Sequence, residues 1–137
     1  MNAKTPVVVI ARVLLALMFV LAGASKFGDL GGTAGYIASK GLPFPMLLAF
    51  GTAALELIGG LAIMLGLQAR IAALALAVFT LLASVLFHNF WAMPADQQMM
   101  QQLMFMKNLS VAGGLLLLFS FGAGAASFDA RRQPVAA

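Results

Sequence analysis

Long apolar stretches separated by short polar segments dominate this chain of 137 residues. Four stretches are present, at Val7 to Ser25, Met46 to Leu67, Ile71 to Phe87 and Leu109 to Ala126. At a rise of about 1.5 Å per residue, each is long enough, or nearly so, to cross a hydrocarbon core of about 30 Å as a helix. The pattern therefore predicts an all-α, polytopic membrane protein with four transmembrane helices.

Polar segments and segments rich in glycine or proline separate these stretches and set the expected helix limits. We expect helices over residues 7–26, 46–67, 70–91 and 103–125, in a single membrane domain that covers residues 1–137. Short connections between successive helices favour an antiparallel four-helix bundle. An even number of spans places both termini on one side of the membrane.

The composition supports a membrane protein and excludes a soluble one. Hydrophobic residues make up 63% of the chain and charged residues 9%, and the mean hydropathy is +1.03. Because soluble domains carry about a quarter charged residues, this chain cannot cover a globule in water with polar surface. The net charge of +4 is spread along the chain rather than gathered on one polar face. We therefore expect membrane lipids as partners and no nucleic acid.

The basic residues near the ends of the spans indicate an orientation. Those on the side of the termini are Lys4, Arg70, Arg131 and Arg132, and those on the other side are Lys26, Lys40 and Lys107. Lysine and arginine are enriched in cytoplasmic loops, so this small bias predicts cytoplasmic termini.

Only two charged residues, Arg12 and Glu56, lie inside the apolar stretches, and their signs are opposite. A charge near the middle of a span costs at least about 2.5 to 3.5 kcal/mol, so it normally faces the protein interior and has a partner. Arg12 lies about 9 Å and Glu56 about 16 Å into their helices from the terminal side, a gap that a long arginine side chain can bridge. We predict that they pair directly or through one water. The pair is either a structural bridge that fixes helix register or a site that handles protons or substrate.

A second polar group is expected at the opposite end of the bundle. It contains Lys26, His88, Asn89, Trp91, Lys107 and Asn108. An antiparallel bundle brings the ends of the first and third helices and the start of the fourth to one membrane face. Such a mixed aromatic and polar wall suits an amphipathic ligand with a polar head, such as a quinone or an anionic lipid. The alternative is that these side chains only anchor helix ends at the lipid headgroups.

The sequence predicts no metal site and specifies no catalytic residues. It has no cysteine, which excludes a disulfide, a thiolate ligand and a thiol nucleophile within the chain. His88 is the only histidine, so one chain cannot supply several imidazole ligands. The methionines from Met99 to Met106 do not share one helical stripe, and we interpret them as apolar filler rather than copper ligands. Whether the chain is an enzyme stays open.

The order of several short motifs resembles the DoxX family of small four-helix membrane proteins. After an arginine early in the first span, the motifs are Ala22-Gly23-Ala24-Ser25-Lys26-Phe27, Glu56 with Gly59-Gly60, Leu65-Gly66-Leu67, His88-Asn89-Phe90-Trp91, Lys107-Asn108-Leu109 and Gly122-Ala123-Gly124-Ala125-Ala126-Ser127-Phe128-Asp129. The resemblance extends over nearly the whole chain. Because that family takes its name from a membrane subunit associated with thiosulfate:quinone oxidoreductase, the resemblance implies a bacterial inner-membrane protein with a redox partner.

Three functions are compatible with these observations. The first is an integral subunit of a redox-linked complex that binds quinone or lipid between its helices, without a covalent cofactor, while an oxidoreductase partner supplies the redox centre. The second is a non-enzymatic structural or assembly protein of the membrane. The third is a small transporter, which at this length and without a repeat between its halves would have to form a homo-oligomer.

Overall fold

The structure is a computed structural model that describes residues 4–132 of the chain. In chain order its elements are α1 (Lys4–Gly28), α2 (Leu30–Ser39), α3 (Pro45–Leu65), α4 (Ala69–Phe87), the short 3₁₀ helix η1 (Phe90–Ala92), α5 (Ala95–Phe121) and α6 (Phe128–Arg131). Four of these helices, α1, α3, α4 and α5, are long and apolar enough to cross a membrane. The predicted all-α, four-span membrane fold is therefore confirmed.

The helix limits differ from the expected ones mainly at α5 and α4. α5 begins at Ala95 rather than near residue 103, because glutamine and methionine are good helix formers and no glycine or proline interrupts residues 95–112. It stops at Gly122, whose φ of 82° leaves the helical region, although the chain stays apolar beyond it. α4 ends at Phe87 rather than at residue 91, and η1 follows it.

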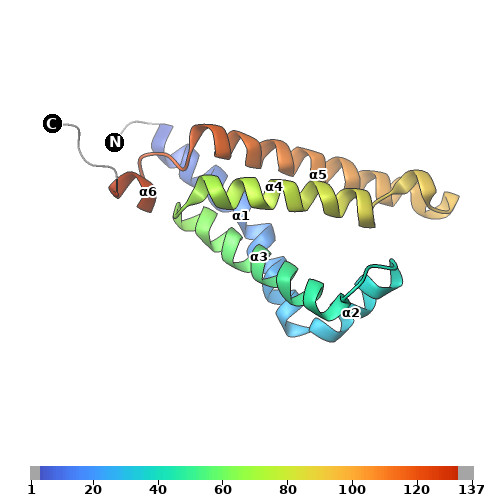
Figure 1. Cartoon of the computed structure of the whole chain (residues 1–137). Coiled ribbons are helices and arrows are strands. Elements are labelled where there is room, and N and C mark those ends of the chain that lie inside the picture. The colour runs from blue at the N-terminus through green and yellow to red at the C-terminus, as the bar shows by residue number, and fades with distance from the viewer. Residues whose placement is uncertain (1–3, 133–137) are drawn as a thin grey trace.

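The four long helices form two antiparallel pairs, α1 with α3 and α4 with α5. Figure 1 shows that the pairs meet where α1 begins and α5 ends, and that they diverge toward α2. We call the first of these ends the terminal end and the second the cavity end.

Close backbone contact holds α1 against α3. A Cβ atom added to Gly23 would lie 2.5 Å from the backbone nitrogen of Leu57, and one added to Gly60 would lie 3.0 Å from that of Val20. No larger side chain fits at either glycine unless a helix moves. Small residues of this kind allow membrane helices to approach closely, where van der Waals packing holds them together.

One buried apolar core joins all four long helices. Its members are Ala16, Phe19, Ile63, Ala73, Leu76, Ala77 and Leu115. A smaller core attaches α2 to α3 through Ala34, Ile37 and Ala49, with Phe87 of α4 packed against it. The rings of Tyr36 and Phe87 lie 5.4 Å apart between centroids. The short helix α2 therefore bridges the two pairs at the end where they diverge.

Candidate functional site

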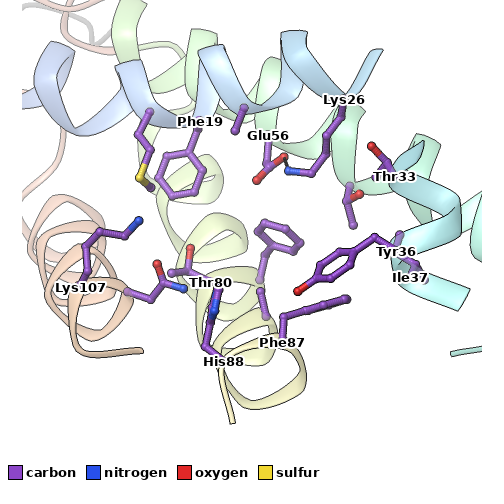
Figure 2. Close-up of a pocket in the computed structure, with 16 residues that line it drawn as sticks. Phe19, Lys26, Thr33, Tyr36, Ile37, Glu56, Thr80, Phe87, His88 and Lys107 are labelled. Carbon is purple, nitrogen blue, oxygen red and sulfur yellow. Dashed lines mark hydrogen bonds and ion pairs between the residues drawn. The ribbon is translucent and has the colours of Figure 1, made fainter. Parts of the chain in front are cut away.

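A cavity of about 320 Å³ lies between the two helix pairs at the cavity end. Its apolar lining consists of Met18, Phe19, Ala22, Ile37, Phe79, Ala83 and Phe87, and its polar lining consists of Lys26, Thr33, Tyr36, Thr52, Glu56, Thr80, His88, Lys107 and Asn108. We call this space the interhelical cavity (Figure 2). Tyr36 is 51% exposed and Lys107 is also exposed, although both line it, so the cavity communicates with the outside of the bundle.

An ion pair between Lys26 of α1 and Glu56 of α3 forms one side of the interhelical cavity (Figure 2). The Nζ atom of Lys26 donates to Oε2 of Glu56. The Glu56 side chain is only 8% exposed, whereas that of Lys26 is 29% exposed. The carboxylate is thus held inside the bundle, and the ammonium that neutralises it lies closer to the cavity mouth.

A second polar group comes from α4 and α5. In Figure 2, Thr80, His88 and Lys107 lie on the side of the cavity away from the Lys26–Glu56 pair. His88 Nδ1 donates to Oε1 of Gln101 at 2.8 Å, which leaves Nε2 of a neutral ring as a hydrogen-bond acceptor. Among the residues that the structure describes, the Lys107 ammonium contacts only the sulfur of Met104, at 3.7 Å.

The hydroxyl of Thr80 is the most unusual polar group in this wall. Thr80 is 4% exposed, and its Oγ1 has no hydrogen-bond partner among the described residues. Four residues later on the same helix, Ser84 Oγ donates to the Thr80 carbonyl at 2.8 Å, the usual solution for a hydroxyl in a membrane helix. Thr80 does not adopt this solution, so its hydroxyl remains available to a group inside the cavity.

The predicted pairing of Arg12 with Glu56 is wrong. Both side chains are buried, at 5% and 6% exposure, but Glu56 lines the interhelical cavity whereas Arg12 lies at the terminal end. Arg12 lies against Gly66, where the guanidinium is close to the position of an added Cβ atom. Gly66 follows Glu56 by ten residues, or about 15 Å along α3, which neither a direct contact nor one water can bridge.

Arg12 instead forms hydrogen bonds with the segment that follows α5. Its Nη1 donates to the Ala123 carbonyl at 2.7 Å and its Nη2 to the Ala126 carbonyl at 3.1 Å. The glycines Gly122 and Gly124, with φ of 82° and 81°, turn this segment back over the bundle.

Asp129 completes the closure of the terminal end. Its Oδ1 accepts from the backbone nitrogen of Gln68 at 2.7 Å and its Oδ2 from that of Ala69 at 2.9 Å. These are free donors at the start of α4, so a residue distant in sequence supplies the N-cap. The Asp129 backbone nitrogen also donates to the Gly66 carbonyl at 2.9 Å.

The structure brings four of the six predicted ligand-site residues to one place. Lys26, His88, Lys107 and Asn108 all line the interhelical cavity. Asn89 and Trp91 lie outside its lining. Trp91 is 57% exposed and packs against the rings of Phe90 and Phe105, at 5.3 and 5.7 Å between centroids.

Sequence reasoning placed neither Thr80 nor Tyr36 at the ligand site. A signal for Thr80 was present, because it continues the buried stripe of Ala73 and Ala77 at helical spacing. A hydroxyl on such a stripe marks a polar position inside an apolar face. Tyr36 could not be found in this way, because its place depends on how α2 folds back between the helix pairs.

Within residues 4–132, no group of three or more histidine, cysteine, aspartate or glutamate side chains lies together as a metal ion would require. The polar groups of the cavity are instead hydrogen-bonding and charged groups of opposite sign around aromatic rings. Pockets for small organic ligands are typically apolar and aromatic with a few polar groups of this kind.

Comparison with known proteins gives a consistent picture over most of the chain. The DoxX family model matches residues 7–89. The inner membrane protein YqjF of Escherichia coli (strain K12) is 43% identical over 127 residues, which cover 89% of this chain and 88% of YqjF. The inner membrane protein YphA of the same organism is 36% identical over 129 residues, covering 94% and 92%.

A more partial match is to a protein of Bacillus subtilis (strain 168) named "Putative oxidoreductase CatD". It is 37% identical over 75 residues, which cover 55% of this chain and 54% of that protein. No solved structure matches the chain.

Proposed function

The chain belongs to the DoxX family of inner-membrane proteins, and on that premise we propose that it binds the ring of a membrane quinone in the interhelical cavity. We propose that it does so as the membrane subunit of a redox-linked complex. The observation that carries the proposal is an aromatic cavity between two separate polar groups, inside a bundle whose outer surface is apolar.

The size of the cavity supports a ring without its tail. A volume of about 320 Å³ is at the lower end of the range of ligand pockets, enough for one substituted ring. The long apolar tail of a quinone would remain in the lipid, which the cavity reaches past Tyr36 and Lys107. A fully enclosed cavity would not admit such a molecule.

The residues of the walls have distinct tasks in this proposal. Phe19, Phe79 and Phe87 provide the apolar faces that contact the ring. Lys26, held by Glu56, supplies a donor for a carbonyl oxygen on one side, and the Thr80 hydroxyl supplies a donor on the other. When bound, a quinone supplies the capacity to accept electrons, while this chain positions the ring and excludes water from it.

The redox partner is proposed on two grounds. One curated relative carries the word oxidoreductase in its name, although it matches only part of this chain. The other is chemical, because this chain has no cysteine and no metal-binding cluster within the described residues that could pass electrons to a ring. A partner protein would then bring the electrons to the cavity end.

Binding is tested with the full chain purified in a neutral detergent. Native mass spectrometry should detect one quinone per chain, and calorimetric titration with a short-tailed quinone should saturate at that ratio. Replacing Phe79 with alanine should weaken binding about tenfold or more, whereas Arg70→Met at the terminal end should leave the affinity unchanged. The absence of saturable binding would overturn the proposal and favour a structural role or a transporter.

We also propose that the termini are cytoplasmic, which places the cavity toward the periplasm. The support is the excess of basic residues at the terminal end. A reporter fused after Ala137 should behave as cytoplasmic. Periplasmic reporter activity would reverse the orientation without changing the number of spans.

A further inference from the structure

We propose that the interhelical cavity contains a subsite for a negatively charged oxygen of its ligand, formed by Lys107, Thr80 and Asn108. The subsite depends on the proposed function in one respect, because it lies in the same cavity. It would serve equally well for an ionised oxygen on a ring or for the charged head of a lipid-like molecule.

The first observation is a charge without a partner. Among the described residues the only ion pair is Lys26 with Glu56, so the two charges on that side of the cavity cancel. Lys107 adds a third charge, and its ammonium has only a thioether within reach. The charged side chains lining the cavity therefore sum to one net positive charge.

The second observation is the depth of that charge. The contact between His88 and Gln101 places these two residues at one level near the end of α4. Lys107 follows Gln101 by six residues, or about 9 Å farther along α5 toward the bundle centre. Its side chain points back by about one helical turn to Met104, so the ammonium lies just inside the cavity end, at the level of the polar lining. Figure 2 shows it directed toward the cavity.

The third observation is the Thr80 hydroxyl, which is independent of the charge count. It is buried, it lines the same cavity and it has no partner within residues 4–132. A buried hydroxyl left without a hydrogen bond is costly, and a ligand oxygen would remove that cost. The side chain of Asn108, next to Lys107 in the chain, can donate from its amide to the same oxygen.

These three groups are hydrogen-bond donors that line the same cavity, and in the proposal one ligand oxygen accepts from them. An anionic oxygen suits them better than a neutral carbonyl, because hydrogen bonds to charged groups are shorter and stronger. Glu56 is the only carboxylate in the lining, and it is held by Lys26. The chain therefore leaves Lys107 to be neutralised by the ligand.

The test compares two rings of the same size. Naphthoquinone is neutral, whereas lawsone is the same ring with one acidic hydroxyl that is ionised at neutral pH. We expect the full chain in neutral detergent to bind lawsone at least about tenfold more tightly by calorimetric titration. Lys107→Met should reduce that preference to less than about twofold, because it lowers the affinity for lawsone more than the affinity for naphthoquinone. Lys107→Gln serves as a second variant, and Arg70→Met is the matched control.

Two simple amphiphiles, dodecanoate and dodecyl phosphate, separate a carboxylate from a phosphate source. If naphthoquinone binds and lawsone binds no better, the anion subsite is wrong and the quinone proposal stands. If neither ring binds while an amphiphile binds in a way that depends on Lys107, the quinone proposal is wrong and the subsite stands. If Lys107→Met lowers the affinity for both rings equally, Lys107 does not recognise the charge, and the subsite is overturned.

Discussion

At the terminal end of the bundle, Arg12 directs both terminal nitrogens of its guanidinium to carbonyls of its own chain, and only Nε lacks a partner within residues 4–132. At the cavity end, Lys107 has no carboxylate partner and the Thr80 hydroxyl has no hydrogen bond among the same residues. Both ends carry a positive charge on a membrane-spanning helix, buried in the case of Arg12 and at the cavity mouth in the case of Lys107. The two ends differ in whether the chain itself supplies hydrogen-bond acceptors for that charge.

The difference separates a structural use of polar residues from a binding use. Arg12 binds two backbone carbonyls of the segment after α5, and Asp129 binds two backbone nitrogens where α4 begins. The terminal end is therefore closed by the chain itself. The cavity end keeps donors that only a second molecule can satisfy. Substitutions at the terminal end should therefore change stability, and those at the cavity end should change binding more than stability.

The largest expected effect on stability comes from the Lys26–Glu56 pair. This pair is an exception to the division, because it lies at the cavity end but its two charges neutralise each other. Lys26→Met leaves a carboxylate that is only 8% exposed without its cation. Removing one partner of a buried pair typically costs about 3 to 5 kcal/mol in the free energy of unfolding. Denaturant unfolding of the purified protein in micelles measures the loss.

Two further variants control for this reading. Glu56→Leu should cost less than Lys26→Met, because the longer, more exposed lysine can turn toward the headgroups. The double variant Lys26→Met with Glu56→Leu should recover most of the stability, since no charge is left behind, but it should not recover ligand binding. A double variant as unstable as Lys26→Met would show that the pair contributes more than mutual neutralisation.

Arg12→Met should have the next largest effect. It removes two hydrogen bonds from a charged donor and leaves their carbonyls near hydrocarbon, but it leaves no buried charge behind, so the cost should stay below that of Lys26→Met. The segment after Gly122 should then become sensitive to protease, which limited proteolysis detects. Arg70→Met, also at the terminal end, removes an exposed side chain that lies against Gly122 but makes no hydrogen bond or ion pair within the described residues, so it should affect stability and protease resistance clearly less than Arg12→Met. Loss of ligand affinity in Arg12→Met with intact folding would contradict the division between the two ends.

Most of the fold could be predicted from the sequence, because membrane spans depend on the length and hydropathy of a local segment. The exceptions occur where a local pattern is ambiguous. The apolar window at the end of α5 extends past Gly122, and hydropathy alone does not show that Gly122 and Gly124 turn the chain back. The glutamines after Ala95 were assigned to a connector for their polarity, although their helix propensity is high.

The partners of the buried charges could not be predicted from the sequence. The depth of a residue along its helix can be counted from the sequence, and that count alone places Arg12 and Glu56 close enough to pair. The angle between helix pairs, and the backbone carbonyls exposed by a loop, arise only from the complete fold. The prediction at the cavity end did not depend on which residues pair. The expectation that span ends meet at one membrane face was enough to locate Lys26, His88, Lys107 and Asn108.

Asp129→Ala tests a smaller contribution to the terminal end. Loss of an N-cap side chain costs about 1 kcal/mol, and here the cap serves the first nitrogens of α4. Asp96→Ala, an exposed acidic residue in the first turn of α5, should cost no more than a few tenths of a kcal/mol. Equal effects of the two substitutions in denaturant unfolding would show that the cap from the C-terminal segment adds nothing specific.

The smallest expected effect on stability, and the sharpest contrast between the ends, comes from Thr80→Val. Valine has nearly the same shape as threonine and lacks the hydroxyl, so it removes a buried polar group that has no partner. Replacing such a group with a methyl should leave the free energy of unfolding unchanged or raise it by up to about 1 kcal/mol. Ser84→Ala is the matched control on the same helix, because that hydroxyl donates to the Thr80 carbonyl and its loss should not affect binding. If the cavity end is built for a ligand, Thr80→Val gains or keeps stability and loses affinity for lawsone. A clear loss of stability in the ligand-free protein would show that the hydroxyl serves the fold instead, and the two ends would then use their polar residues alike.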